Sequence, residues 1–268
     1  VKSLGVAFAD EGVRLRKIGI TIPIIVLNPD ENSFIQLYEY NLDFEVYSLH
    51  QLNSIINWRD GKLKSNQLHL KLDTGMSRLG FQESNIEKLK IIISENQLKI
   101  GSILSHLASS EDSADDAFSH LQAERFLKMY EDLTSILSYR PKRHLLNSSG
   151  IIRFPDYHFE AVRLGLGLYG IDSTEILKDR LEKVHTLKAR VIQIKNVKPG
   201  DYVGYNRRHK VEKEMTIGIL NIGYADGFIR MCGNSRYEVL IRNTKIKVIG
   251  NVCMDLSIVD LTNQHHIK

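Results

Sequence analysis

Short apolar runs alternate with helical patterns along the first two-thirds of the chain, and this alternation most limits the possible folds. Strands that alternate with helices indicate βαβ units and a parallel sheet. The runs predict seven strands, at residues 4–9, 22–27, 44–49, 68–73, 100–108, 143–148 and 162–170. Helices are predicted between them at residues 10–18, 84–97 and 116–138, the first with Asp10 as its N-cap and Gly19 as its stop.

Seven strands are too many for most doubly wound sheets and one too few for an eight-stranded barrel. Val1 lies close to the first predicted strand. We therefore expect an α/β chain that forms a (β/α)8 TIM-type barrel whose first strand precedes Val1.

The pattern changes after about residue 175. Short strands are predicted at residues 187–197, 215–222, 237–242, 245–249 and 252–259, with turn signals such as Pro199-Gly200 and no long helical stretch. We expect two domains: a barrel over residues 1–175 that is incomplete at its N-terminus, and a mostly β domain over residues 176–268 that is incomplete at its C-terminus.

The composition excludes several classes of protein. With 36 Lys and Arg against 32 Asp and Glu, the net charge of +4 is too small and too dispersed to predict nucleic-acid binding. The longest apolar block, residues 22–27, is far shorter than the ~20 residues of a membrane helix. The two cysteines, Cys232 and Cys253, imply no disulfide framework, so we expect a cytoplasmic protein, and no metal site is predicted.

Polar residues gather where the predicted strands end, which is the face of such a barrel that carries chemistry. Four clusters, at residues 73–78, 105–106, 147–150 and 163–167, would meet on one rim. Each also has a structural interpretation. Lys71 shares a strand face with His69 and Asp73 and could simply form an ion pair with Asp73. Gly165 and Gly167 could merely relieve crowding in the barrel. Their coincidence on one rim favours a functional site.

The clusters suit a phosphorylated aromatic ring and an amino acid. The Ser148 hydroxyl and the backbone N–H groups of Gly165 and Leu166 could bind a phosphate. His106 could stack on a flat ring, and Arg163 could face a ring nitrogen or a carboxylate. Arg78 could clamp a carboxylate through two hydrogen bonds.

Ordered motifs along nearly the whole chain resemble those of the alanine racemase family, which uses pyridoxal 5′-phosphate. The motifs are Ala9-Asp10-Glu11-Gly12, Leu70-Lys71-Leu72-Asp73-Thr74-Gly75-Met76 with Arg78-Leu79-Gly80, Ser105-His106, Asn147-Ser148, Val162-Arg163, Leu168-Tyr169-Gly170, Val203-Gly204-Tyr205, Gly223-Tyr224-Ala225-Asp226-Gly227 and Cys253-Met254-Asp255. The resemblance implies an isomerase that interconverts L- and D-alanine and supplies D-alanine for peptidoglycan.

The resemblance also assigns roles to residues. Tyr205 would be one of two catalytic bases and would act in the partner subunit's site of a homodimer, with His106 and Arg163 supporting the cofactor ring. Ser148, Gly165 and Leu166 would bind the phosphate. The substrate would meet Arg78, braced by an often carbamylated Lys71, together with the Met254 backbone, Asp255 and, at the entrance, Tyr224. Asn206 follows Tyr205 where many relatives have Gly.

Two chemical expectations follow from those roles. A tyrosine with its ordinary pKa of about 10 needs a cation such as Arg163 to act as a base at neutral pH. Because a guanidinium keeps its proton, a ring nitrogen that faces Arg163 should stay unprotonated, which limits side reactions.

The family's second base, a lysine in a Lys-Ala-x-Ala-Tyr-Gly motif that also bonds to the cofactor, has no match in these 268 residues, and Lys2 does not fit it. A C-terminal tyrosine that usually contacts the phosphate has no match either. We therefore expect the chain as given to be inactive by itself. Three alternatives remain: a racemase of broader specificity, a non-catalytic cofactor-binding module, and a barrel domain within a fusion protein.

Overall fold

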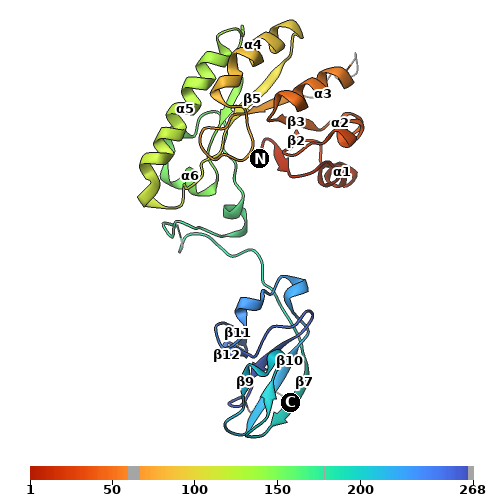
Figure 1. The fold of residues 1–268 in the computed structure, drawn as a ribbon, viewed down its shortest axis with the longest axis vertical. Helices are drawn as coiled ribbons and strands as arrows, with labels where there is room; N and C mark the ends of the chain where they lie inside the picture. The colour runs from red at the N-terminus through yellow and green to blue at the C-terminus, as the bar shows by residue number, and fades with distance from the viewer. Residues whose placement is uncertain (60–66, 178, 265–268) are drawn as a thin grey trace. The chain divides into compact units, whose positions relative to one another are not determined.

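The chain folds into two compact units, Val1–Val184 and His185–Lys268, each with its own hydrophobic core (Figure 1). The computed structural model describes residues 1–59, 67–177 and 179–264. Within that part of the chain, no helix is both long and apolar enough to cross a membrane.

The first unit is built on six parallel strands in sequential order. These are β1 (Leu4–Val6), β2 (Ile24–Val26), β3 (Asp43–Val46), β4 (Leu68–Lys71), β5 (Ile100–Leu104) and β6 (Lys142–His144). The α-helices that follow them in turn are α1 (Ala9–Lys17), α2 (Phe34–Glu39), α3 (Leu49–Arg59), α4 (Ile86–Glu95), α5 (Asp116–Thr134) and α6 (Ser148–Arg153). The α/β class and six of the seven predicted strands are confirmed.

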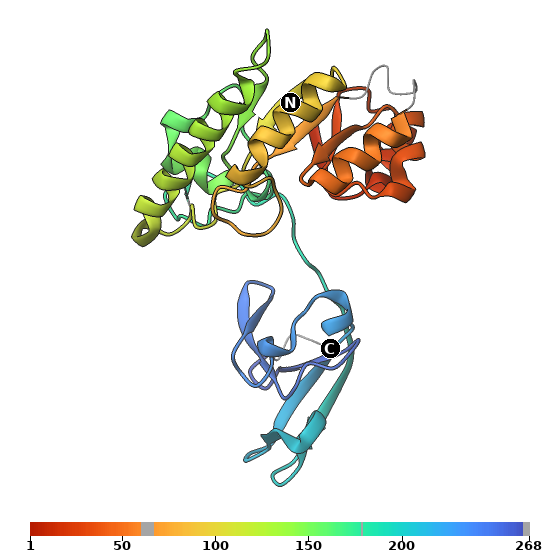
Figure 2. The same cartoon turned by 45° about the horizontal axis from the view of Figure 1, so that its top comes forward.

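The helices α4 and α5 lie side by side over the outside of the sheet, and Figure 2 shows the same pair, in yellow and green, from a second angle. Strand residues Phe44, Leu70 and Ile103 join helix residues Leu89 and Phe126 in one buried cluster. Because side chains alternate across a strand, the residues between them face the other side of the sheet.

That other side, here called the inner face, is polar although it is buried. It carries Glu45 on β3, His69 and Lys71 on β4, Ser102 on β5 and His144 on β6, all of them at most 9% exposed. Burial of so many polar groups is unfavourable unless they bind one another. The inner face is therefore where a hydrogen-bonded site is to be sought.

The predicted strand at residues 162–170 is wrong. Leu166–Tyr169 form a 3-10 helix. The backbone bonds described to the β6 region are isolated: Ala161 N, just before the segment, donates to Arg143 O (3.2 Å), and Arg163 N donates to Leu146 O (2.9 Å). The N–H groups of two glycines that a strand ladder would use are directed instead to a serine hydroxyl, as described below.

The first predicted helix begins earlier than expected. Its N-cap is Phe8, not Asp10, because the Glu11 carboxylate accepts hydrogen bonds from the backbone N–H groups of Ala7 (2.7 Å) and Phe8 (3.0 Å). Asp10 lies in the first turn instead. The predicted stop is confirmed, since Gly19 follows the helix with a φ of +93°.

The second unit is mostly β, as predicted. Its five-stranded antiparallel sheet has the order β11-β12-β13-β10-β7. A two-stranded hairpin, β8-β9, lies between β7 and β10 in the sequence. The strands are β7 (Val191–Val197), β8 (Tyr202–Val203), β9 (His209–Lys210), β10 (Met215–Leu220), β11 (Glu238–Ile241), β12 (Thr244–Ile249) and β13 (Ser257–Asp260). Arg242 and Asn243, both with positive φ, turn β11 into β12.

Core packing of α5 gives the first test of the fold. Leu133 is fully buried in the helix–sheet cluster, whereas Leu121 on the same helix is 39% exposed. Leu133→Ala should lower the free energy of unfolding by about 2–5 kcal/mol because it leaves a cavity, and Leu121→Ala by no more than about 0.5 kcal/mol. Urea denaturation of both variants checks this, and equal effects would contradict the packing described.

Candidate functional site

The guanidinium of Arg163 is enclosed by acceptors from β5, β6 and the residues that follow them. Its Nη1 donates to the carbonyl oxygen of His144 (2.8 Å) and to His144 Nδ1 (2.9 Å). Its Nη2 donates to the carbonyl oxygens of Ser105 (2.6 Å) and Leu145 (2.9 Å) and lies 3.1 Å from His106 Nδ1. Burial lowers the pKa of Arg163 to about 10, so the group remains a cation at neutral pH.

The two imidazoles beside Arg163 are neutral. Burial, followed by the positive charge of Arg163, lowers the pKa of His106 to about 4. The same causes in the same order hold the pKa of His144 well below its usual value. The cluster thus combines one fixed cation with two uncharged rings, and His106 is the partly exposed one.

A cradle of donors lies at the start of α6. The Ser148 hydroxyl oxygen accepts the backbone N–H groups of Gly165 (3.0 Å) and Gly167 (3.2 Å), so the first turn of α6 and the 3-10 helix at Leu166 begin next to each other. Asn147 caps α6 by accepting from Gly150 N at 2.9 Å. Hydroxyl and N–H groups at two adjoining helical turns suit a phosphate. The structure therefore brings together the three residues predicted to bind one.

The ammonium of Lys71 forms a buried ion pair that the sequence analysis missed. Lys71 Nζ lies 2.8 Å from Glu45 Oε1, and the two side chains are 11% and 0% exposed. Burial raises the pKa of Glu45 although Lys71 opposes the shift. The expected contact between Lys71 and Arg78 is not among the contacts of the described residues. The signal that could have found Glu45 is its spacing of two from Asp43, which puts both on one face of β3.

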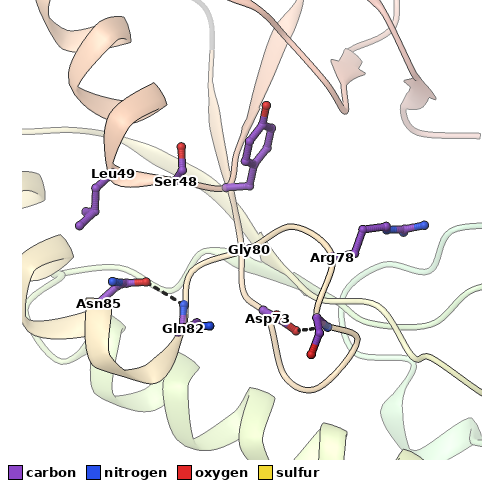
Figure 3. A pocket seen from close by; sticks show the side chains of 9 residues that line it. Ser48, Leu49, Asp73, Arg78, Gly80, Gln82 and Asn85 are labelled. Carbon is purple, nitrogen blue, oxygen red and sulfur yellow. Dashed lines mark hydrogen bonds between the residues drawn. The ribbon is translucent and has the colours of Figure 1, made fainter.

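Arg78 extends from the loop after β4 at a pocket of about 430 Å³ (Figure 3). The loop is shaped by Asp73, whose carboxylate accepts from Gly75 N and Ser77 N, each at 3.0 Å. At Gly80, with a φ of +136°, a Cβ would lie 2.5 Å from Asp73 N, so the loop can close only with glycine there. The pocket is lined by Tyr47, Ser48, Leu49, Asp73, Ser77, Arg78, Gly80, Gln82 and Asn85.

The pocket, His106 and Ser148 share one edge of the sheet. They follow the carboxyl ends of β3, β4, β5 and β6, which are parallel neighbours. The charge of Arg78 contributes to the lowered pKa of His106, which agrees with this placement. The predicted meeting of polar clusters on one rim is thus present in the first unit.

In the second unit the structure brings together the other predicted site residues. The backbone N–H of Tyr224 donates to Cys253 O (3.0 Å), and that of Ala225 donates to Met254 O (2.9 Å), which ties the two loops to each other. Asn251 Nδ2 donates to the carbonyl oxygen of Tyr205 at 3.0 Å. The side chains of Tyr205, Tyr224 and Met254 are 65%, 38% and 54% exposed, and Asp255 is exposed as well.

Close approach of those loops depends on Gly223, which the sequence analysis did not single out as a separate residue. A Cβ at this position would lie 2.2 Å from Met254 O and 2.4 Å from Cys253 O. The backbone of the second unit's site therefore requires glycine here.

The comparisons with known proteins agree along the whole chain. The family model for the alanine racemase N-terminal domain matches residues 1–173, and that for the C-terminal domain matches residues 184–268. The alanine racemase of Methanococcus maripaludis is 34% identical over 99% of this chain and 72% of its own length.

Solved structures show the same likeness. The alanine racemase of Bacillus anthracis with bound L-Ala-P is 28% identical, with a TM-score of 0.86, over 100% of this chain and 70% of that one. The alanine racemase of Bartonella henselae, with covalently bound pyridoxal phosphate, is 27% identical, with a TM-score of 0.86, over 98% of this chain and 72% of that one.

The residue after Tyr205 gives a test of the local backbone. Asn206 has φ 59° and ψ 18°, the left-handed conformation that Gly and Asn adopt most readily. Asn206→Gly should change the free energy of unfolding by less than about 0.5 kcal/mol, and Asn206→Val should lower it by about 1–2 kcal/mol. Thermal or urea unfolding measures both, and a Val variant as stable as the Gly variant would refute this backbone assignment.

Proposed function

The chain belongs to the alanine racemase family, and we propose that its Arg163 cluster and Ser148 cradle form the cofactor site for the interconversion of L- and D-alanine. The cofactor is pyridoxal 5′-phosphate, as throughout this family. The observation that carries the proposal is the enclosure of Arg163 between two neutral imidazoles beside a hydroxyl and N–H cradle. This donor set fits a flat heteroaromatic ring with a phosphate attached.

Each part of the cofactor has a fitting partner. The phosphate would be held by the Ser148 hydroxyl and the N–H groups of Gly165 and Leu166, with the Gly165 N–H donating to the phosphate in place of Ser148 Oγ. His106, neutral and partly exposed, would lie against the ring. Arg163 has only donors, and the described bonds engage its Nη1 and Nη2, so its Nε–H would be the group left to face the ring nitrogen. A ring nitrogen that accepts from a guanidinium would stay unprotonated.

Bound pyridoxal 5′-phosphate supplies an electron sink for the loss of the substrate's Cα proton. Racemisation then needs one base on each face of the substrate. We assign Tyr205 as one of them. Its side chain is 65% exposed, so the phenol is accessible to a substrate, and a cationic neighbour such as Arg163 would favour its anion.

The substrate's carboxylate would be held by Arg78 at the 430 Å³ pocket and by the Met254 backbone. Asp255 and Tyr224 would border the substrate, with Tyr224 narrowing the entrance. Lys71, paired with Glu45, would support this region as a buried ammonium.

The other base is proposed to be a lysine outside residues 1–268, because no Lys-Ala-x-Ala-Tyr-Gly motif occurs in the sequence. By itself, the chain would therefore hold the cofactor weakly and without a specific covalent bond. The first strand of the barrel is proposed to lie with that lysine, next to the β1 edge of the six-stranded sheet.

A homodimer with shared sites is part of the proposal. The cofactor residues belong to the first unit and Tyr205 and Met254 to the second, so each site could combine the first unit of one subunit with the second unit of its partner.

Replacement of Tyr205 tests its role in the active enzyme. Tyr205→Phe should slow racemisation about 100-fold or more, as for the loss of a general base, and should enlarge the primary deuterium isotope effect in the L-to-D direction. Tyr202→Phe, on the preceding strand and 41% exposed, is the matched control and should keep full activity. A Tyr205→Phe enzyme as active as the unaltered enzyme in both directions would refute the assignment.

Shared sites are tested by mixing two inactive variants of the active enzyme. Tyr205→Phe damages only the second unit, and Arg163→Ala only the first, so one hybrid site in a mixed dimer would contain both native residues. Subunit exchange should restore part of the activity in a racemisation assay. If exchange occurs and no activity returns, the sites are not shared in this way.

Borohydride reduction tests the chain by itself. Residues 1–268 incubated with pyridoxal 5′-phosphate and borohydride should yield no single modified lysine on peptide mass mapping, and should not turn over L-alanine. One specifically modified lysine within this chain, together with turnover, would show that the catalytic lysine has been misplaced.

A further inference from the structure

The buried inner face of the sheet contains a series of hydrogen-bonded side chains that leads from Arg163 across β6 and β5 to β4. His69 on β4, Ser102 on β5 and His144 on β6 are 6%, 3% and 7% exposed. Ser102 Oγ lies 2.6 Å from His69 Nδ1 and 2.7 Å from His144 Nε2, so this hydroxyl bridges the two imidazoles. At the far end, His69 Nε2 lies 3.6 Å from Asp43 Oδ2.

The protons in this series of side chains can be placed by starting from Arg163. A guanidinium can only donate, so His144 Nδ1, 2.9 Å from Arg163 Nη1, must be an acceptor without a proton. A neutral imidazole then carries its proton on Nε2, which donates to Ser102 Oγ. The low pKa of His144 agrees with the neutral form.

The order continues through the hydroxyl. Ser102 Oγ accepts from His144, and its one other described partner is His69 Nδ1, so the proton of this buried hydroxyl is donated there. His69 then carries its proton on Nε2, on the side of the Asp43 carboxylate. His69 Nε2 has no hydrogen-bond partner among the described residues, so the tautomer of His69 is set at Nδ1, by Ser102.

We propose that Ser102 is a positioning residue that links two histidines of fixed tautomer into a proton-ordered series of hydrogen bonds, His69–Ser102–His144, ending on Arg163. Its direction is set by Arg163, which can only donate, and the Ser102 hydroxyl passes that direction on to His69. The Nε2 proton of His144, donated to Ser102, leaves Nδ1 to accept from Arg163, which agrees with a single orientation of the guanidinium.

Other charged groups border this series of side chains. Glu45 is the register partner of His69 on β3, and it is occupied by Lys71, two residues beyond His69 on β4. Asp43 accepts Gln67 N through its other oxygen at 2.8 Å, which fixes the carboxylate. Glu45 and Asp43 thus bind other groups. The hydrogen bond described at His69 Nδ1 is the one with Ser102.

The tautomers follow from the geometry around Arg163, whereas their use in holding the cofactor rests on the proposed function. The test therefore reads the tautomers directly and needs neither cofactor nor activity. Nitrogen-15 NMR of the side chains of the 268-residue protein, labelled in histidine and assigned through the backbone, distinguishes a protonated from an unprotonated ring nitrogen. His69 and His144 should each show a protonated Nε2 and an unprotonated Nδ1 at pH 7.

A Ser102→Ala variant separates the linking role from simple packing. In this variant His144 should keep its Nε2 proton, because Arg163 still occupies Nδ1, while His69 should lose its single tautomer and show a protonated fraction at Nδ1. Ser119→Ala is the matched control: it removes a fully buried hydroxyl on α5 that has no described partner, and should leave both histidine spectra unchanged.

Two results would overturn the proposal. A proton on Nδ1 of either histidine in the unaltered protein at pH 7 would break the order assigned here. Unchanged tautomers of both histidines in a folded Ser102→Ala variant would show that Ser102 does not link them. Since these spectra are taken without pyridoxal 5′-phosphate, either result would leave the proposed racemase function to be judged by its own experiments.

Discussion

The site depends on one interaction, the enclosure of the Arg163 guanidinium by oxygen and nitrogen acceptors at the edge of the parallel sheet. A buried cation is unfavourable unless it is fully hydrogen-bonded. Three carbonyl oxygens and two imidazole nitrogens meet that need, and the positive charge in turn keeps His106 and His144 neutral. A positive, donor-only group therefore stands between uncharged rings, which is the environment that an unprotonated heteroaromatic nitrogen would need.

One face of the sheet packs against the helices, and the other carries the polar groups near the site. Phe44, Leu70 and Ile103 pack against the helices, and their burial drives folding of the first unit. The alternate residues build the polar inner face, where polar groups bind one another: Lys71 pairs with Glu45, and Ser102 joins two histidines. Since strand geometry fixes both sets at once, the positions of the polar groups are set by the same packing that stabilises the sheet.

Much of this arrangement could be predicted from the sequence, because apolar runs and strand ends are local signals. Six strands, the mostly β second unit and the gathering of His106, Ser148 and Arg163 on one edge follow from them. The strand expected at residues 162–170 failed because its apolar residues say nothing of where glycine N–H groups point, and two of those groups bond to Ser148. Glu45 was missed because its partner, Lys71, is distant in sequence and comes close only because β3 pairs with β4, where Lys71 lies two residues beyond the register partner of Glu45. Helices α2 and α3 were missed because the first is short and the second has a weak apolar stripe.

The state of the cofactor's ring nitrogen tests the central claim most directly, since the claim is that Arg163 is held as a donor toward it. Pyridoxal 5′-phosphate labelled with nitrogen-15 in the ring and bound to the active enzyme can be observed by NMR at neutral pH. The account predicts the chemical shift of an unprotonated ring nitrogen that accepts a hydrogen bond. A protonated ring nitrogen, at the shift of a pyridinium, would contradict it.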